Sequence, residues 1–215
     1  YPDRARPDGR FYAFDFSLAE LQTLSLHERT NAHGEPIFPD RFPAADLKLR
    51  IPTLAEEIEL ILGLNRSRGR QAGLYIELKA PQFHTREGAD IARETLAVLT
   101  QYELNTPDSP VILQCFDPNT LRHLAQDLQT PLALIQLIAE NAWRETEGVD
   151  FDAMRTSNGL ATIAEYAQGI GPWLGHLFQA DGHSDSGLVG RAHRHGLAVH
   201  TYTLRADQLP QHWSD

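Results

Sequence analysis

Residues 73–81 read Gly-Leu-Tyr-Ile-Glu-Leu-Lys-Ala-Pro, and this stretch has the composition of a buried strand that ends at a proline. Side chains two positions apart in a strand point to the same side, so Tyr75, Glu77 and Lys79 share one face. Charges in an apolar strand are costly unless they pair, bind a metal or reach a wet cleft. Glu77 offers a hard oxygen ligand for a divalent cation, and Lys79 offers a positive charge for a phosphate. An ordinary ion pair at the rim of a sheet is the alternative.

Strands and helices alternate through the rest of the chain. Further strands are expected at residues 111–116, 131–139, 169–172 and 197–204. Helices are expected at about 87–102, 160–167 and 186–195, with another that begins at Asp117 and Pro118. Such alternation predicts βαβ units and a parallel sheet that is covered by helices, which is the α/β class.

The polar and aromatic residues of interest fall toward the C-terminal ends of these strands. They are Glu77, Lys79, Gln114, Phe116, Gln136 and Tyr202. In α/β folds, and above all in the eight-stranded barrel, that end of the sheet carries the site. The chain offers about five strands where a full barrel has eight, and a typical barrel needs about 250 residues. We therefore expect some barrel units to lie outside this sequence.

Composition limits the partners. The 215 residues favour one domain, and the formal net charge of −10 with no basic run argues against nucleic acid. No apolar run approaches the length of about 20 residues that a membrane span needs. Cys115 is the only cysteine, so a disulfide within the chain is excluded. The chain begins without methionine and ends just after a strand-like segment, so we expect it to be a piece of a longer protein.

The N-terminal part is polar and carries two helix-start signals. Ser17 with Glu20, and Thr53 with Glu56, have the spacing of capping boxes at the start of two helices. Between these signals, residues 27–46 are rich in proline and glycine and are expected to form a long loop.

Several motifs in this order resemble one known family. They are Asp-Phe-Ser-Leu-Ala-Glu-Leu at 15–21, Ile-Pro-Thr-Leu-Ala-Glu-Glu at 51–57, Glu-Leu-Lys-Ala-Pro at 77–81, Leu-Gln-Cys-Phe-Asp at 113–117, Gln-Leu-Ile-Ala at 136–139, Tyr-Ala-Gln-Gly-Ile-Gly-Pro at 166–172 and His-Thr-Tyr-Thr-Leu-Arg at 200–205. From end to end, the chain resembles the glycerophosphodiester phosphodiesterases. The likeness is greatest to the periplasmic enzymes of bacteria.

The resemblance implies a fold, a reaction and a location. The fold would be a (β/α)₈ TIM barrel, incomplete here, with residues 1–47 as a small inserted subdomain and 48–215 as the partial barrel. The family hydrolyses small-molecule glycerophosphodiesters to glycerol 3-phosphate and an alcohol, with a divalent cation that is commonly Ca²⁺ or Mg²⁺. A periplasmic or secreted location would follow. The oligomeric state stays open.

The resemblance also gives roles to single residues. Glu77 matches the strand glutamate that binds the metal, and Lys79 matches the lysine that contacts the phosphate. Gln114 and Phe116 match a strand end that lines the pocket. Tyr202 stands where relatives often carry an aromatic residue.

The sequence departs from the family pattern in its catalytic groups. The family's His-Arg-Gly motif and its Glu-x-Asp metal pair precede the matched region, and neither occurs in these 215 residues. The chain is therefore expected to contain no catalytic histidine and to be inactive alone. The alternatives are a non-catalytic module that binds phosphate esters and a barrel of the sphingomyelinase D type. His176, His183, His193 and His195 are interpreted as surface residues.

Overall fold

A computed structural model describes residues 1–39 and 49–205, which belong to two compact units, Tyr1–Arg68 and Gly69–Asp215. The expected division between residues 1–47 and 48–215 falls outside the described residues and stays a prediction. In the described ranges, no helix has both the length and the apolar character needed to cross a membrane.

The first unit has little regular structure apart from one long helix. Its elements are η1 (Pro2–Arg4), η2 (Ala13–Asp15), α1 (Leu18–Leu21) and α2 (Leu54–Arg68). Both predicted capping boxes are present. The Glu20 carboxylate accepts from the backbone N–H of Ser17 at 2.8 Å, and the Glu56 carboxylate accepts from that of Thr53 at 2.7 Å. The short polar pattern of these caps was therefore enough to place both helix starts.

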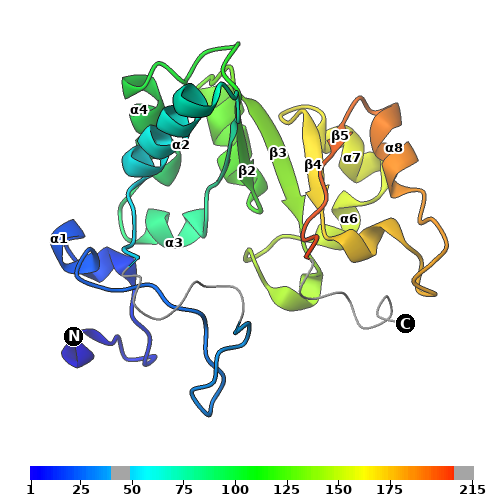
Figure 1. The fold of residues 1–215 in the computed structure, drawn as a ribbon. Helices are drawn as coiled ribbons and strands as arrows, with labels where there is room; N and C mark the ends of the chain where they lie inside the picture. Colours follow the sequence, from blue (N-terminus) through cyan, green and yellow to red (C-terminus); the bar gives the residue numbers. More distant parts are fainter. Residues whose placement is uncertain (40–48, 206–215) are drawn as a thin grey trace. The chain divides into compact units, whose positions relative to one another are not determined.

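The second unit is built on one parallel sheet, as predicted. Its strands are β1 (Leu74–Glu77), β2 (Val111–Cys115), β3 (Ala133–Ile138), β4 (Gly169–Pro172) and β5 (Ala198–Val199). They are hydrogen-bonded in sequence order, and each neighbouring pair is parallel. All five strands therefore end at the same edge of the sheet (Figure 1).

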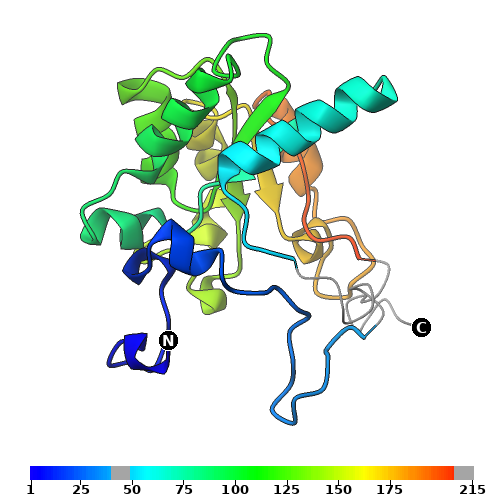
Figure 2. The ribbon, with the colours of Figure 1, turned by 60° about the vertical axis from the view of Figure 1, so that its left-hand side comes forward.

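Helices and short turns fill the connections between these strands. They are α3 (Pro81–Arg86), α4 (Ile91–Gln101), α5 (Pro118–Arg122), the π-helical turn η3 (His123–Asp127), η4 (Asn141–Trp143), α6 (Phe151–Met154), α7 (Ser157–Ile163), η5 (Leu174–Leu177) and α8 (Leu188–Arg194). Within this unit, α5 packs against β2 and β3, and α8 packs against β5. Figures 1 and 2 show these helices beside the strands.

The sheet is curved, as a contact between side chains from its two edges shows. The Tyr75 hydroxyl on β1 lies 2.9 Å from Nδ1 of His200, which follows β5 directly. Strands between them carry buried apolar residues such as Leu113, Leu134 and Ile170. A curved parallel sheet with helices in its connections is the arrangement of a partial α/β barrel.

The structure corrects several predicted element boundaries. The helix expected at 87–102 begins only at Ile91, because the Asp90 side chain caps it by accepting from the Arg93 N–H at 3.0 Å. The short helices α3 and α6 were not predicted. The expected strand 197–204 pairs only through Ala198 and Val199, with one further bridge at Tyr202.

Candidate functional site

The Glu77 and Lys79 head groups lie together at the C-terminal edge of the sheet. Lys79 Nζ is 3.2 Å from Glu77 Oε1, and the two side chains are 69% and 29% exposed, respectively. Glu77 Oε1 is buried, and among the described residues it accepts no hydrogen bond of good geometry. Its contact with Lys79 is therefore an ion pair. A carboxylate oxygen has more than one acceptor site, so a cation or a donor could bind Glu77 Oε1 once Lys79 moves aside.

The backbone after Lys79 adopts a conformation that a non-glycine residue rarely takes. Ala80 has φ 47° and ψ 51°, in the left-handed region, and Pro81 then begins α3. Such a residue costs roughly 1–2 kcal/mol, and residues of this kind cluster at functional sites. The turn bends the chain sharply out of β1 directly after the Glu77 and Lys79 pair.

The next strand contributes Gln114 and Phe116. Gln114 is paired with Glu77 in the register between β1 and β2, and its carbonyl accepts from the Leu78 N–H at 2.9 Å. Phe116 follows the end of β2, and its ring centroid lies 5.9 Å from Lys79 Nζ. This distance is within the range of a cation–π contact. Both predicted residues therefore lie at the same edge as Glu77.

Tyr202 joins this group through its contact with Phe116. The two ring centroids are 5.8 Å apart in an edge-to-face arrangement. The Tyr202 hydroxyl donates to the carbonyl of Ile138 at 3.0 Å, at the end of β3. Burial raises the pKa of the Tyr202 phenol, and so do the carboxylates of Glu145, Glu77 and Glu140. The phenol is therefore neutral, and the surroundings of its oxygen are acidic.

A buried amide fixes the strand ends beneath these residues. Gln136 on β3 is fully buried, and its Nε2 donates to the carbonyls of Leu137, Phe116 and Cys115 at 2.9, 3.0 and 3.3 Å. Its Oε1 accepts from the Tyr166 hydroxyl at 2.8 Å. The amide thus ties the end of β2, where Phe116 sits, to β3.

The five predicted residues are therefore neighbours, but their predicted roles remain predictions. Within residues 1–39 and 49–205, no three His, Cys, Asp or Glu side chains gather as a metal site. Ca²⁺ takes six to eight oxygen ligands, and Glu77 would supply one or two of them. The residue type and its spare oxygen fit a divalent cation, whereas a complete ligand set is not formed by the described residues.

Sequence reasoning missed a second group of residues at this edge, and its interpretation of His176 was wrong. His176 follows β4, and its side chain is 1% exposed. Its Nε2 lies 2.9 Å from Oε1 of Glu140, which follows β3. Trp173 stands edge-on to both His176 and Trp143, with centroid separations of 5.5 and 5.4 Å. The position of His176 just beyond a predicted strand end was the one signal available in the sequence.

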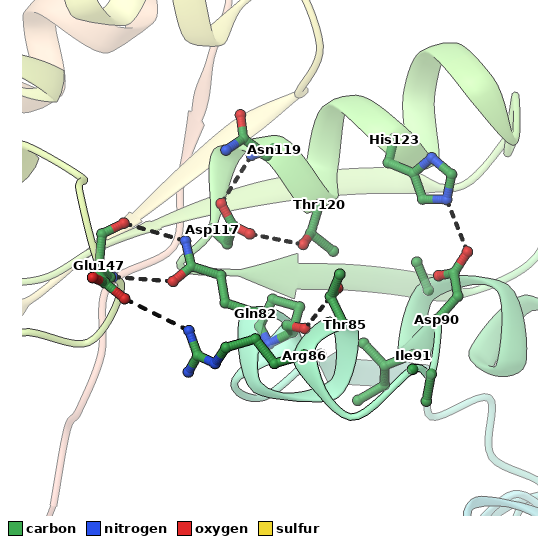
Figure 3. A pocket seen from close by; sticks show the side chains of 14 residues that line it. Gln82, Thr85, Arg86, Asp90, Ile91, Asp117, Asn119, Thr120, His123 and Glu147 are labelled. Atoms are coloured by element: carbon green, nitrogen blue, oxygen red, sulfur yellow. Dashed lines mark hydrogen bonds and ion pairs between the residues drawn. The ribbon is translucent and has the colours of Figure 1, made fainter.

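A cavity of about 780 Å³ lies among α3, the start of α4 and the start of α5 (Figure 3), and Glu77 is not one of its lining residues. Its polar groups are paired with one another. His123 Nε2 is 3.1 Å from Asp90 Oδ2, and Arg86 is 3.6 Å from Glu147. Gln82 exchanges two hydrogen bonds with the backbone of Glu147, at 3.2 and 3.3 Å. Since these groups satisfy each other, the cavity gives no sign of a missing ligand.

Comparisons with known proteins agree with the resemblance seen in the sequence. Two curated relatives are named glycerophosphodiester phosphodiesterase. The relative from Haemophilus influenzae is 36% identical over all of this chain, and the one from Treponema pallidum is 32% identical over 99% of it. The chain spans 65% of the length of each.

A solved structure and a family model complete the comparison. A crystal structure of a putative glycerophosphoryl diester phosphodiesterase from Silicibacter pomeroyi superposes with a TM-score of 0.60 at 24% identity, over 87% of this chain and 58% of that one. This likeness supports the barrel-like fold. The model of the glycerophosphoryl diester phosphodiesterase family matches residues 3–214. The chain belongs to the glycerophosphoryl diester phosphodiesterase family.

Proposed function

We propose that this chain is part of a metal-dependent hydrolase that converts glycerophosphodiesters to glycerol 3-phosphate and an alcohol. The observation that carries the proposal is the pair of Glu77 and Lys79 at the C-terminal edge of the sheet, with one buried carboxylate oxygen that has no hydrogen bond. Membership of the family supports the reaction class.

In this proposal each head group has a separate task. Lys79, which is largely exposed, is free to follow a phosphoryl oxygen and to balance its charge. Glu77 would hold a divalent cation, Ca²⁺ in the first place and Mg²⁺ as the alternative. When bound, such an ion stabilises the charge that develops on the phosphoryl oxygens. Gln114, Phe116 and Tyr202 would form the wall against which the substrate lies.

Proton transfer needs groups that this set of residues does not supply. Hydrolysis of a phosphodiester requires a base for the nucleophile and an acid for the leaving alkoxide. We propose that the catalytic histidines lie outside these 215 residues, as in the family pattern. The chain alone should then bind metal weakly and show no hydrolysis.

The test compares the 215-residue chain with a longer protein in which segments that carry the family's His-Arg-Gly and Glu-x-Asp motifs precede it. Glycerol 3-phosphate release from glycerophosphocholine is measured with added Ca²⁺ and with a chelator. We expect release only from the longer protein and only with the cation. Robust Ca²⁺-dependent release by the 215-residue chain would falsify the idea that its catalytic groups lie elsewhere.

Two substitutions in the longer protein test the residue roles. Lys79→Ala should lower kcat by roughly 10²–10³-fold, as the removal of one preorganised charge or donor commonly does. Glu77→Gln should raise the Ca²⁺ concentration needed for half-maximal activity. Glu94→Gln, at an exposed position of α4, is the matched control and should change neither. Unchanged activity of Glu77→Gln at every Ca²⁺ concentration would remove Glu77 from the site.

A further inference from the structure

The Lys79 ammonium has two neighbours, the Glu77 carboxylate and the ring of Phe116. Lys79 Nζ lies 3.2 Å from Glu77 Oε1 and 5.9 Å from the centroid of the Phe116 ring. The lysine side chain is largely exposed, so packing does little to hold it. Among the described residues, the carboxylate and the ring are therefore the groups that fix the position of the ammonium.

The carboxylate alone is a weak anchor for this side chain. Lysine carries its charge on a flexible four-carbon stem, and an exposed stem keeps most of its freedom. An ion pair with an exposed partner contributes little and is screened by salt. A second contact that does not depend on the carboxylate would narrow the positions that the ammonium samples.

Phe116 is itself held from several directions. Its ring stands edge-to-face with the buried Phe151 and with Tyr202, at centroid separations of 6.1 and 5.8 Å. Its carbonyl accepts from Gln136 Nε2 at 3.0 Å. The residue is half-buried, so part of its surface stays accessible. Phe116 is thus a fixed group beside a flexible one.

We propose that Phe116 is a positioning residue for Lys79, and that its ring keeps the ammonium at the strand edge independently of Glu77. The face of an aromatic ring carries partial negative charge and attracts an ammonium. The ring has no lone pairs that would occupy the three N–H donors, so these stay available to an acceptor such as a phosphoryl oxygen. This role is additional to a place in the wall of the site.

The contact would matter most when Glu77 holds a cation, and this step rests on the proposed function. The ammonium would then lose part of its attraction to the carboxylate, whereas its attraction to the neutral ring would remain. Lys79 would stay at the strand edge, where the proposed substrate lies. Phe116→Leu keeps an apolar side chain but removes the ring, so it would leave the ammonium to sample more positions.

The chain contains only two lysines, Lys48 and Lys79, so the ammonium can be followed directly. Reductive methylation with ¹³C-formaldehyde labels both lysines and the amino terminus, and a methylated lysine keeps its charge. Lys79→Arg assigns the signal. Because the ring current shifts protons over a ring face upfield, we expect the Lys79 methyl signal upfield of its own position in the urea-unfolded chain.

Variants separate the ring from the carboxylate. Phe116→Leu should move the Lys79 signal to its urea position, and Phe116→Tyr should leave it upfield. Glu77→Gln removes the ion pair and should also leave it upfield. Phe11→Leu, at an exposed position of the first unit, is the control and should match the wild type. A wild-type signal at the urea position, a signal that Phe116→Leu leaves upfield, or one that Glu77→Gln alone returns to the urea position would overturn the proposal.

Circular dichroism separates loss of the ring from loss of the fold. Phe116→Leu also removes the contacts with Phe151 and Tyr202, and an unfolded variant would show the urea position for a trivial reason. Phe116→Met is therefore measured as a second variant without a ring, and only folded variants are compared. Phe116→Tyr keeps the test decisive, because its signal stays upfield only in a folded chain with a ring at this position.

The longer protein supplies the readout for the reaction. Phe116→Leu should lower kcat about two- to fivefold, the size of a cation–π contact at an exposed site, and Phe116→Tyr should restore it. In the Lys79→Ala background the same exchange should have no further effect, because the ring acts through the lysine. An equal loss in both backgrounds would make Phe116 a wall residue only and would contradict the positioning role.

The outcomes separate this proposal from the proposed function. The lysine signal requires neither metal nor hydrolysis. An upfield Lys79 signal that depends on Phe116 would support the contact even if the longer protein hydrolysed no glycerophosphodiester. Hydrolysis by the longer protein, together with a Lys79 signal that does not depend on Phe116, would end this proposal and leave the proposed function intact.

Discussion

Replacing Gln136 by methionine should destabilise the second unit, because this amide is fully buried and both of its ends are hydrogen-bonded. Methionine has a similar length and keeps the volume filled, so the change isolates the polar term from cavity formation. The NH₂ group has two protons for its three carbonyl contacts, so with the bond from Tyr166 the amide counts as three hydrogen bonds, and at about 1 kcal/mol net for each the loss is about 3 kcal/mol. The greater apolarity of the new side chain offsets about 1 kcal/mol of this. We expect a net loss of about 2 kcal/mol.

The assay is urea unfolding followed by circular dichroism, with Tyr166→Phe and the double variant measured in parallel. Tyr166→Phe alone removes the 2.8 Å bond to Gln136 Oε1 and should cost about 1 kcal/mol. In the Gln136→Met background the hydroxyl has no acceptor, so its removal should cost nothing or restore some stability. The expected coupling between the two sites is then about 1–2 kcal/mol. Gln101→Met, at an exposed position of α4, is the control for the exchange itself.

Two results would refute this reasoning about the amide. A loss below about 0.5 kcal/mol in Gln136→Met would place the substitution among ordinary surface changes. Additive costs in the double variant would show that the amide and the phenol do not depend on each other. A lower slope of the unfolding curve would instead indicate a loss of two-state behaviour, and the free energies would then be taken from the midpoint regions only.

Three further predictions use single residues. Hydrogen bonding to Asp127 raises the pKa of His123 in the folded chain. The stability that the protonated imidazole contributes is therefore fully present below the ordinary histidine pKa of about 6.5, and it is lost as the pH rises through the raised pKa. The difference in unfolding midpoint between wild type and His123→Ala should shrink above neutral pH. A Cβ at Gly175 would overlap the Trp173 ring, so Gly175→Ala should change the near-ultraviolet circular dichroism and cost about 1–3 kcal/mol in urea unfolding. Burial raises the pKa of the Cys115 thiol to about 12, so a thiol reagent should label it only in unfolding concentrations of urea, and rapid labelling of the native chain would contradict its burial.

The parts of the fold that could be predicted are those encoded over short distances. Apolar, β-rich runs placed all five strands, because strands covered on both faces read as continuous apolar segments. The Ser17 and Thr53 caps needed only residues three positions away. Helix α3 was not predicted, because it begins directly after Ala80, which has a left-handed conformation. Alanine disfavours that conformation, so the sequence gives no sign of the turn. The last strand was predicted too long: β5 ends at Val199, although the N–H groups of His200 and Tyr202 still donate to the carbonyls of Ile170 and Pro172.

In the candidate site, too, the residues that could be predicted are those with a local signal in the sequence. Glu77 and Lys79 were found because two charges at period two in an apolar strand are costly without a purpose. The grouping of Phe116 with Tyr202 needed the resemblance, since 86 positions separate them in the chain (202 − 116). The prediction for His176 was wrong because it was grouped with His183, His193 and His195, although its own neighbours Leu174, Leu177 and Phe178 are apolar. Its burial depends on Glu140 and Trp173, which come from other strand ends, and that packing has no local signature in the sequence.

The electrostatics of the strand ends link the two proposed roles of Glu77 and Lys79. The carboxylates of Glu145, Glu77 and Glu140 all raise the pKa of Tyr202, so the field at its oxygen is negative, and the chain as a whole carries a formal charge of −10. A phosphodiester is an anion and would be repelled by such a field unless positive charge lies nearby. Lys79 supplies one positive charge, and its Nζ lies 3.2 Å from the Glu77 carboxylate. On the proposed function, a divalent cation on Glu77 would compete with Lys79 for the carboxylate and would offset the net negative charge that these three carboxylates and one ammonium leave. On the proposed function, the ammonium would be more available to a phosphate when the carboxylate holds metal, so phosphate affinity and metal affinity should rise together.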